Sequence, residues 1–600
     1  MTLQPHHDGS SLYVSDSSPA LLDTIQVKLR VPATWQPEWV AIRWLHDAEG
    51  QLTPATVVAT DTQETWWQAD MLIRNPVAKY RWLLVGGNVG YGWVNASGWH
   101  DYDVADGEDF MVCTYEPAPL WSKSAVVYQI FPDRFASSGT AYPRAGWEIP
   151  RQWHEIPEPR TPETGRFYYG GDLPGVTSKL DYIQELGADT LYFTPIFPAG
   201  SAHRYDAKTY TRIDPLLGGD EGFAELTQQA HERGMRVVGD LTLNHCGITH
   251  EWFEQAIADE SAAERQYFFF DTNTQHGYET WANARSLPKF DLRNEELVGR
   301  LITDDDSIVR KWMREPYRLD GWRIDAANVM GRSRHIDVTH EIASQTRTSM
   351  QAERDDFLLI AENTQDAADD LMGDGWHGTM NYSGFTRPVW AWLRRSDDIL
   401  GMGPSVPKFS GGQMVRTITA YMARMPWRSW CATWNYLSSH DTARPRSVMG
   451  TAERQLAGLG LLMGLPGIPL VFAGDEIGLE GDCDDLSRRP FPWDQPELWD
   501  TSTLDVYKKL IHLRKTSSAL CDGGLRWVQV SDDVVAWLRE SSNERLLFAV
   551  SREANTSFSL EAQAWGAAQL ETVHGPDVLH EDGHIHVQLQ DAGVAVWRLR

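Results

Sequence analysis

The chain has 600 residues, of which 42% are hydrophobic. This length is too great for a single hydrophobic core and predicts roughly two to four domains. Its 83 acidic and 54 basic residues give a formal net charge of -29, which repels phosphate backbones and anionic membrane surfaces. Charge therefore excludes nucleic acid and membranes as expected partners and leaves a neutral or cationic ligand.

The spacing of the cysteines and the first residues of the chain indicate the cellular compartment that we expect. The five cysteines are scattered without C-x-x-C spacing, so neither a disulfide framework nor a zinc site is expected. The first residues, MTLQPHHDGSSLYV, lack a basic segment followed by an apolar one, which predicts a cytoplasmic protein. The longest apolar run, 456–474, is broken by Gly and Pro, and it favours a buried helix followed by a buried strand over a membrane span.

The first part of the chain, residues 1–117, has an all-β pattern. VKLRVP (27–32) alternates apolar and basic residues, and WVAIRW (39–44) and YRWLLV (80–85) are further strand candidates. We expect an N-terminal β-sandwich here.

Residues 118–515 change to short apolar strands separated by helical stretches, the pattern of a parallel sheet. One such helix is predicted in VTSKLDYIQELG (176–187), where Leu180, Ile183 and Leu186 share a face and Gly187 ends the helix. The strand candidates are 126–131, 190–195, 235–243, 321–325, 357–362, 378–382, 432–437 and 468–474. Eight strands with intervening helices predict an α/β fold, a (β/α)8 TIM barrel.

Two further regions complete the expected architecture. After the third barrel strand, residues of about 245–300 form a long connection with room for a small subdomain beside the barrel mouth. Residues 516–600 return to short strands between polar turns, such as RLLFAV (545–550) and HIHVQL (584–589), and predict a C-terminal all-β domain.

Polar side chains collect where four of the barrel strands end. The third strand is followed by Asp240, Asn244 and His245, the fourth by Arg323 and Asp325, the fifth by Glu362 and the seventh by His440 and Asp441. Because reacting groups in such barrels lie at the carboxyl ends of the strands, we interpret this set as a catalytic site rather than a collection of structural ion pairs.

Several carboxylates with a flanking arginine are what glycoside hydrolysis requires. One carboxylate must be ionised to attack or stabilise the sugar cation, and another must be protonated to donate to the leaving oxygen. Arg323, two residues from Asp325 on the same face of a strand, is expected to keep that aspartate ionised, and Glu362 is expected to lie in drier surroundings. Spacing alone leaves retention or inversion of configuration open.

The motifs DLTLNH, GWRIDAAN, LIAEN and LSSHDTAR, in this order and at these strand ends, resemble the four signature regions of the α-amylase family, glycoside hydrolase family 13. Flanking segments such as YQIFPDRF and GIPLVFAGDEIGL resemble the subgroup of neopullulanases, cyclomaltodextrinases, maltogenic amylases and maltodextrin glucosidases. The resemblance covers most of residues 120–515.

The resemblance implies a retaining double displacement with Asp325 as nucleophile, Glu362 as acid/base and Asp441 as stabiliser of the transition state. The substrate-binding residues that it implies are His203, Tyr205, Asp240, Asn244, His245, Arg323, Asn328, His440 and Arg444. No metal or other cofactor is expected, since the Asn- and Asp-rich calcium loop of the subgroup is not evident after the first strand.

Two departures from the family pattern lie on the leaving-group side. Thr364 stands where the subgroup often has an aromatic residue, and Asn328 and Val329 stand where many α-amylases have Lys and His. These changes leave open whether the linkage cleaved is α-1,4 or α-1,6.

The expected substrate is therefore a short α-glucan, linear or cyclic, cleaved to maltose or glucose. A transglycosylase on the same scaffold is the first alternative, and a non-catalytic glucan-binding protein is an alternative of a different class. A homodimer is one assembly that the resemblance implies.

Overall fold

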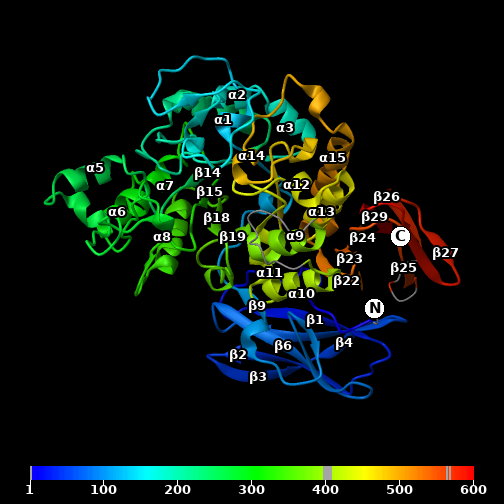
Figure 1. Ribbon diagram of the computed structural model, residues 1–600. Coiled ribbons are helices and arrows are strands. Elements are labelled where there is room, and N and C mark those ends of the chain that lie inside the picture. The colour runs from blue at the N-terminus through cyan, green and yellow to red at the C-terminus, as the bar shows by residue number, and fades with distance from the viewer. Residues whose placement is uncertain (1–2, 396–407, 563–564, 566–568) are drawn as a thin grey trace.

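The computed structural model describes residues 3–395, 408–562, 565 and 569–600. Most of its strands form three groups along the chain (Figure 1): the N-terminal sheets in blue, a central barrel surrounded by helices, and the C-terminal strands in red.

The N-terminal group is a sandwich of two antiparallel sheets. One sheet has the order β1-β5-β4, and the other has the order β3-β2-β6-β7-β8 with β9 paired to β6. Its strands are β1 (Thr24–Pro32), β2 (Trp39–His46), β3 (Glu49–Pro54), β4 (Thr56–Thr60), β5 (Glu64–Leu72), β6 (Val77–Gly86), β7 (Gly90–Asn95), β8 (Gly98–His100) and β9 (Phe110–Cys113). Val27 and Leu29 of β1 share one core with Ile42 of β2 and Trp82 of β6, so the two sheets pack face to face as expected.

The central part is a closed barrel of parallel strands, which confirms the predicted fold class. In barrel order the strands are β10 (Val127–Ile130), β13 (Thr190–Phe193), β14 (Arg236–Leu241), β15 (Gly321–Ile324), β18 (Leu358–Asn363), β19 (Gly378–Asn381), β20 (Trp434–Tyr436) and β21 (Ile468–Phe472). Each falls within one residue of, or inside, a segment predicted as a strand.

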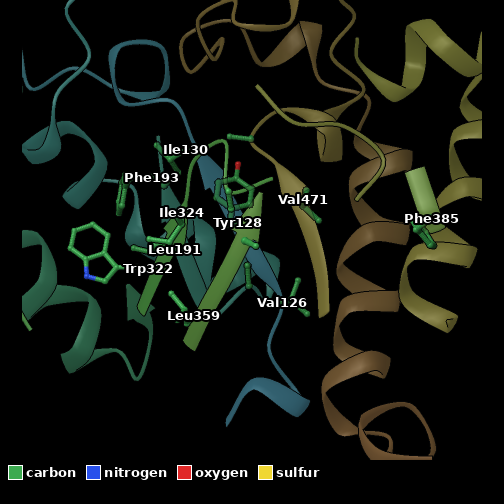
Figure 2. Close-up of a cluster of buried hydrophobic side chains, with 14 of the residues drawn as sticks. Val126, Tyr128, Ile130, Leu191, Phe193, Trp322, Ile324, Leu359, Phe385 and Val471 are labelled. Carbon is green, nitrogen blue, oxygen red and sulfur yellow. The ribbon is translucent and has the colours of Figure 1, made fainter. Parts of the chain in front are cut away.

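Strand alternation sorts the barrel side chains into two layers. Tyr128, Leu191, Trp322 and Leu359 belong to the large cluster that packs against the surrounding helices, and Figure 2 shows them with other members of that cluster. The neighbouring residues on the same strands face inward and form a second cluster, which includes Val127, Tyr192, Val238, Ile360 and Met380. Because side chains alternate, Asp240, Arg323 and Glu362 share the inward face with Val238 and Ile360.

Helices follow most barrel strands and cover the outer layer. They include α2 (Leu173–Thr177), α3 (Leu180–Leu186), α4 (Gly219–Glu232), α7 (Ile308–Lys311), α8 (Thr339–Gln351), α9 (Arg387–Leu393), α10 (Gly411–Met422), α11 (Trp427–Ala432), α12 (Pro445–Met449), α13 (Ala452–Gly464), α15 (Thr501–Thr516) and α16 (Ser518–Asp522). In α3 the three predicted contact residues are buried, and Gly187 ends the helix with φ +100. The apolar run 456–474 contains most of α13 and all of β21, as predicted.

The connection after β14 contains α5 (Glu251–Ala258) and α6 (Glu295–Val298), which lie at the left edge of Figure 1. At the other end of the chain two further antiparallel sheets form, with the orders β22-β23-β24-β29-β26 and β25-β28-β27. These strands are β22 (Gly524–Val530), β23 (Val534–Glu540), β24 (Arg545–Ser551), β25 (Thr556–Glu561), β26 (Leu570–His574), β27 (Leu579–Glu581), β28 (His584–Leu589) and β29 (Gly593–Leu599).

Among the described residues, no helix has both the length and the hydropathy that a bilayer crossing requires.

Close packing between β14 and β15 predicts the effect of a single methyl group. A Cβ at Gly239 would lie 2.5 Å from Cζ3 of Trp322, a ring that is 2% exposed and donates from Nε1 to Val309 O. We expect Gly239→Ala to lower the free energy of unfolding by about 1–3 kcal/mol, because the indole has to move within a filled core. Urea titration followed by tryptophan fluorescence measures this change.

Gly107 is the matched control, because a Cβ there meets no atom of the described residues within 4 Å. Gly107→Ala should change the unfolding free energy by no more than about 0.5 kcal/mol. Equal effects of the two substitutions would contradict the packing argument.

Candidate active site

Arg323 lies on β15 inside the barrel, with its side chain fully buried. The parallel register pairs it with Asp240 of β14 on one side and with Ile360 of β18 on the other. Since Trp322 and Ile324 face the helices, alternation turns the guanidinium inward, toward the carboxylates of the neighbouring strands.

The guanidinium of Arg323 contacts three carboxylates. Its Nη1 lies 2.9 Å from Oδ2 of Asp240 and 2.9 Å from Oδ1 of Asp325, and its Nη2 lies 3.0 Å from Oε1 of Glu362. Asp240 belongs to β14, Asp325 directly follows β15, and Glu362 is near the end of β18. One cation therefore joins the acidic groups of three consecutive barrel strands.

The carboxyl of Asp325 holds a proton more readily than a free aspartate does. Burial raises its pKa well above the usual range, the charge of Glu362 raises it further, and Arg323 opposes both effects. The expectation that Arg323 keeps Asp325 ionised is therefore incomplete, because this cation is shared. For Asp240, burial also dominates and raises the pKa to about 6. Burial therefore favours a retained proton on the neighbouring carboxyl groups of Asp325 and Asp240.

Glu362 is held by a backbone donor in addition to Arg323. The N–H of Ala326 donates to its Oε2 at 2.7 Å, and the hydroxyl of Tyr382 lies 3.4 Å from its Oε1. Ala326 has φ +48, a value that residues with a side chain rarely adopt. This left-handed turn directly after Asp325 aims the N–H at Glu362, so the chain reversal serves the site.

A chain of hydrogen bonds runs from β10 to Arg323. Gln129 Nε2 donates to Nδ1 of His440 at 2.7 Å, so the histidine carries its proton on Nε2, which lies 2.6 Å from the hydroxyl of Tyr205. That hydroxyl in turn donates to Oδ2 of Asp240 at 2.9 Å, beside a second donor, the hydroxyl of Tyr192, at 2.7 Å. Burial holds the pKa of His440 well below its usual range, so its ring is neutral.

Asp441 is the most open member of the predicted catalytic set, with a side chain 36% exposed. Its Oδ2 lies 3.0 Å from Nε2 of His440, and its Oδ1 lies 3.1 Å from Nη2 of Arg488. Arg488 also donates from Nε to the carbonyl of His440 at 2.7 Å, so it fixes both the carboxylate and its backbone. Sequence reasoning missed Arg488, because it lies in a distant loop where nothing distinguishes it from Arg489.

His245 and Trp281 line another side of the cluster. Nε2 of His245 lies 3.9 Å from Oδ2 of Asp325, and burial lowers the pKa of this histidine to about 3. Asn244, which precedes His245 in the chain and is also buried, places its Nδ2 3.1 Å from Nδ1 of the His245 ring. Trp281, in the connection after β14, stacks on His245 with ring centroids 5.6 Å apart and stays 40% exposed. One Trp among 27 could not be singled out from the sequence.

The remaining predicted residues differ in where the structure puts them. His203 is half-buried and stacks on Tyr205 with ring centroids 5.9 Å apart. Asn328 is half-buried, and its N–H donates to the carbonyl of Glu362 at 3.3 Å. Arg444 is not brought to the cluster: its guanidinium is 1% exposed and binds Asp475 at 2.8 Å and the carbonyl of Ser487 at 2.7 Å. It supports the loop that carries Arg488.

Within the described residues, no group of three or more His, Cys, Asp or Glu side chains is arranged to hold a metal ion.

Comparison with known proteins gives the family of this chain. The family described as Alpha amylase, catalytic domain, matches residues 129–498. Neopullulanase 2 of Thermoactinomyces vulgaris is 31% identical over 80% of this chain and 79% of its own, and an intracellular maltogenic amylase of Bacillus subtilis is 31% identical over 72% and 69%. The solved structure of a cyclic α-maltosyl-(1→6)-maltose hydrolase of Arthrobacter globiformis superimposes with a TM-score of 0.67, at 30% identity, over 80% of this chain and 100% of that one. The chain belongs to the α-amylase family.

Proposed function

We propose that the protein is a retaining α-glycoside hydrolase that opens cyclic α-glucans and cleaves short linear ones to maltose or glucose. The observation that carries the proposal is Arg323, which holds Asp325 and Glu362 together in one buried cluster. Two carboxyl groups that share one cation can divide into a nucleophile and an acid. The names of the relatives, a neopullulanase, a maltogenic amylase and a hydrolase of a cyclic maltose dimer, support this substrate class.

In the first step, Glu362 gives its proton to the glycosidic oxygen, the bond from that oxygen to the anomeric carbon breaks, and a carboxylate oxygen of Asp325 bonds to that carbon. In the second step, Glu362 takes a proton from water, and the water oxygen displaces Asp325. The configuration at the anomeric carbon is inverted twice and so retained.

Asp441 is proposed to stabilise the charge that develops on the sugar ring between these steps. Its contacts support this role, because Arg488 and His440 fix one oxygen each while the side chain stays half-open to a ligand. His440 and His245, neutral because of burial, can bind sugar hydroxyls without adding charge. The same binding role is proposed for His203, Tyr205, Asn244 and Asn328, with Asp240 and Arg323 organising the site, and it is not proposed for Arg444.

We also propose where the protein is located, how it assembles and where its domains begin and end. A cytoplasmic enzyme is supported by the relative named intracellular maltogenic amylase. A homodimer is supported by apolar side chains exposed on the N-terminal sheets, among them Leu52 at 54% and Val57 at 50%. We propose domains of 1–117, 118–515 and 516–600, with an insertion at about 245–300. The gap between β9 and β10 supports the first boundary, α5 and α6 support the insertion, and β22, which begins at Gly524 after α15 and α16, supports the last domain.

The substrate proposal is tested by incubating the protein separately with maltotriose, cyclomaltodextrins, pullulan and cyclic α-maltosyl-(1→6)-maltose, with products followed by chromatography and mass. We expect the rings to open and to end as maltose or glucose. Products longer than the substrate would instead identify the protein as a transglycosylase. If no product forms and the sugars raise the unfolding temperature, the protein would be a non-catalytic glucan-binding protein.

The role of Glu362 is tested by leaving-group dependence. Glu362→Gln should lower kcat/KM for maltotriose by about 10²–10⁴-fold, because the leaving oxygen then lacks its proton donor. The fluoride of α-maltosyl fluoride leaves without a proton. With this substrate we expect the fold-decrease in the rate of glycosyl-enzyme formation to be at least about tenfold smaller than the fold-decrease in kcat/KM for maltotriose.

The control variant is Glu341→Gln, at an exposed glutamate on α8, which should leave both substrates unaffected. Equal losses for maltotriose and for the fluoride in Glu362→Gln would show that Glu362 is not the acid.

A further inference from the structure

Lys289 links the long connection after β14 to the turn that follows β15. It lies opposite His245 in an antiparallel bridge, so the two side chains are on the same face of the backbone. The next residue, Phe290, is fully buried and packs on Phe268 and Trp252 inside the connection. Alternation therefore turns Lys289 the other way, to the side of His245 and the carboxylate cluster.

The ammonium of Lys289 donates to two carbonyl oxygens of the turn, residues 326–332. Its Nζ lies 2.9 Å from the oxygen of Val329 and also donates to the oxygen of Arg332. Burial lowers the pKa of Lys289 to about 8, so the group is charged at neutral pH. Hydrogen bonds from a charged donor are about twice as strong as those between neutral groups. The contact therefore fixes the turn to the connection.

The same turn holds Glu362. The N–H of Ala326 donates to Oε2 of Glu362 at 2.7 Å, and the N–H of Asn328 donates to its carbonyl oxygen at 3.3 Å. The N–H of Val329 donates back to the oxygen of Ala326 at 3.0 Å, which closes the turn on itself. Because Lys289 holds Val329, a movement of that residue would be passed on to both N–H groups that orient Glu362.

Asp325 is anchored in a different way. Its N–H donates to the carbonyl oxygen of Leu241 at 3.0 Å, beside the barrel ladder, and its carboxylate binds Arg323 at 2.9 Å. Neither contact involves the turn. Loss of the Lys289 ammonium should therefore disturb Glu362 more than Asp325, and this difference can be measured.

We propose that Lys289 is a positioning residue for Glu362, whose ammonium holds the turn 326–332 in the conformation that directs the acid/base at the leaving oxygen. The inference rests on the proposed function, in which Glu362 protonates that oxygen. It gives the connection after β14 a part in proton transfer, in addition to its place beside the barrel mouth.

The experiment compares Lys289→Met with the native chain on two substrates that differ in their need for an acid. The substitution keeps the apolar stem and removes the donors of the ammonium. We expect kcat/KM for maltotriose to fall by about 10–100-fold, because a misplacement of about 1 Å lowers a rate by this much. The fold-decrease for α-maltosyl fluoride, which leaves without a proton, should be at least about threefold smaller. Equal decreases for the two substrates, or none, would overturn the proposal.

Chemical rescue is a readout that a purely structural role does not change. Lys289→Ala lacks the side-chain atoms that n-propylammonium supplies, and the position is half-buried, so an added amine can reach it. At neutral pH, n-propylammonium chloride should raise kcat/KM of Lys289→Ala for maltotriose with a saturable dependence on concentration. A rise no greater than that given by sodium chloride at equal ionic strength would overturn the proposal.

Lys311→Met is the matched control, because the ammonium of Lys311, on α7, also donates to a carbonyl oxygen, that of Thr211, outside the site. It should leave the activity on both substrates unchanged. Thermal unfolding checks that each variant is folded, and the rescue of Lys289→Ala decides the question if Lys289→Met unfolds. An inactive native chain would refute the proposed function together with this inference, whereas an active native chain with unaffected Lys289→Met would refute the inference alone.

Discussion

The site depends on one buried cation. Arg323 has no access to water, and it contacts Asp240, Asp325 and Glu362, each contributed by a different strand or strand end of the barrel. Burying charges is costly unless they are paired, and removing one partner of a buried pair typically costs about 3–5 kcal/mol. The carboxylates therefore cannot be separated from the arginine cheaply, and the barrel register, which aligns Asp240 with Arg323, maintains the arrangement.

The hydrogen-bond chain from Gln129 through His440 and Tyr205 to Asp240 extends this order across the barrel interior. It fixes the tautomer of the histidine, and burial keeps the ring neutral by lowering its pKa, so the donors are oriented before a substrate arrives. Preoriented donors need no rearrangement as charge develops, which is how such sites lower a barrier. Asp441 differs, because among the described residues its carboxylate binds Arg488 and His440 alone, at a half-open edge where a sugar can reach it.

Much of the fold was predictable because the barrel strands are short, apolar and separated by regular helices. Alternation along β14, β15 and β18 also predicts that Asp240, Arg323 and Glu362 share the barrel interior. Gln129 lies in a predicted barrel strand, but its pairing with His440 was not predictable from the local pattern. Arg488 and Trp281 were not predictable, because each reaches the site from a segment whose local pattern says nothing of its distant neighbours. Arg444 shows the converse: it lies in a family-like motif, yet its guanidinium supports a loop behind the site.

The most direct test of the account is the pH dependence of kcat/KM for α-maltosyl fluoride in Arg323→Gln, compared with that of the native chain. Arg323 lowers the pKa of Asp325 against burial and against the charge of Glu362, and the nucleophile must be ionised to attack. Loss of the cation should therefore move the acid limb to higher pH, by roughly 1–3 units. An acid limb at the same pH in both proteins would contradict the claim that this arginine sets the ionisation of the nucleophile.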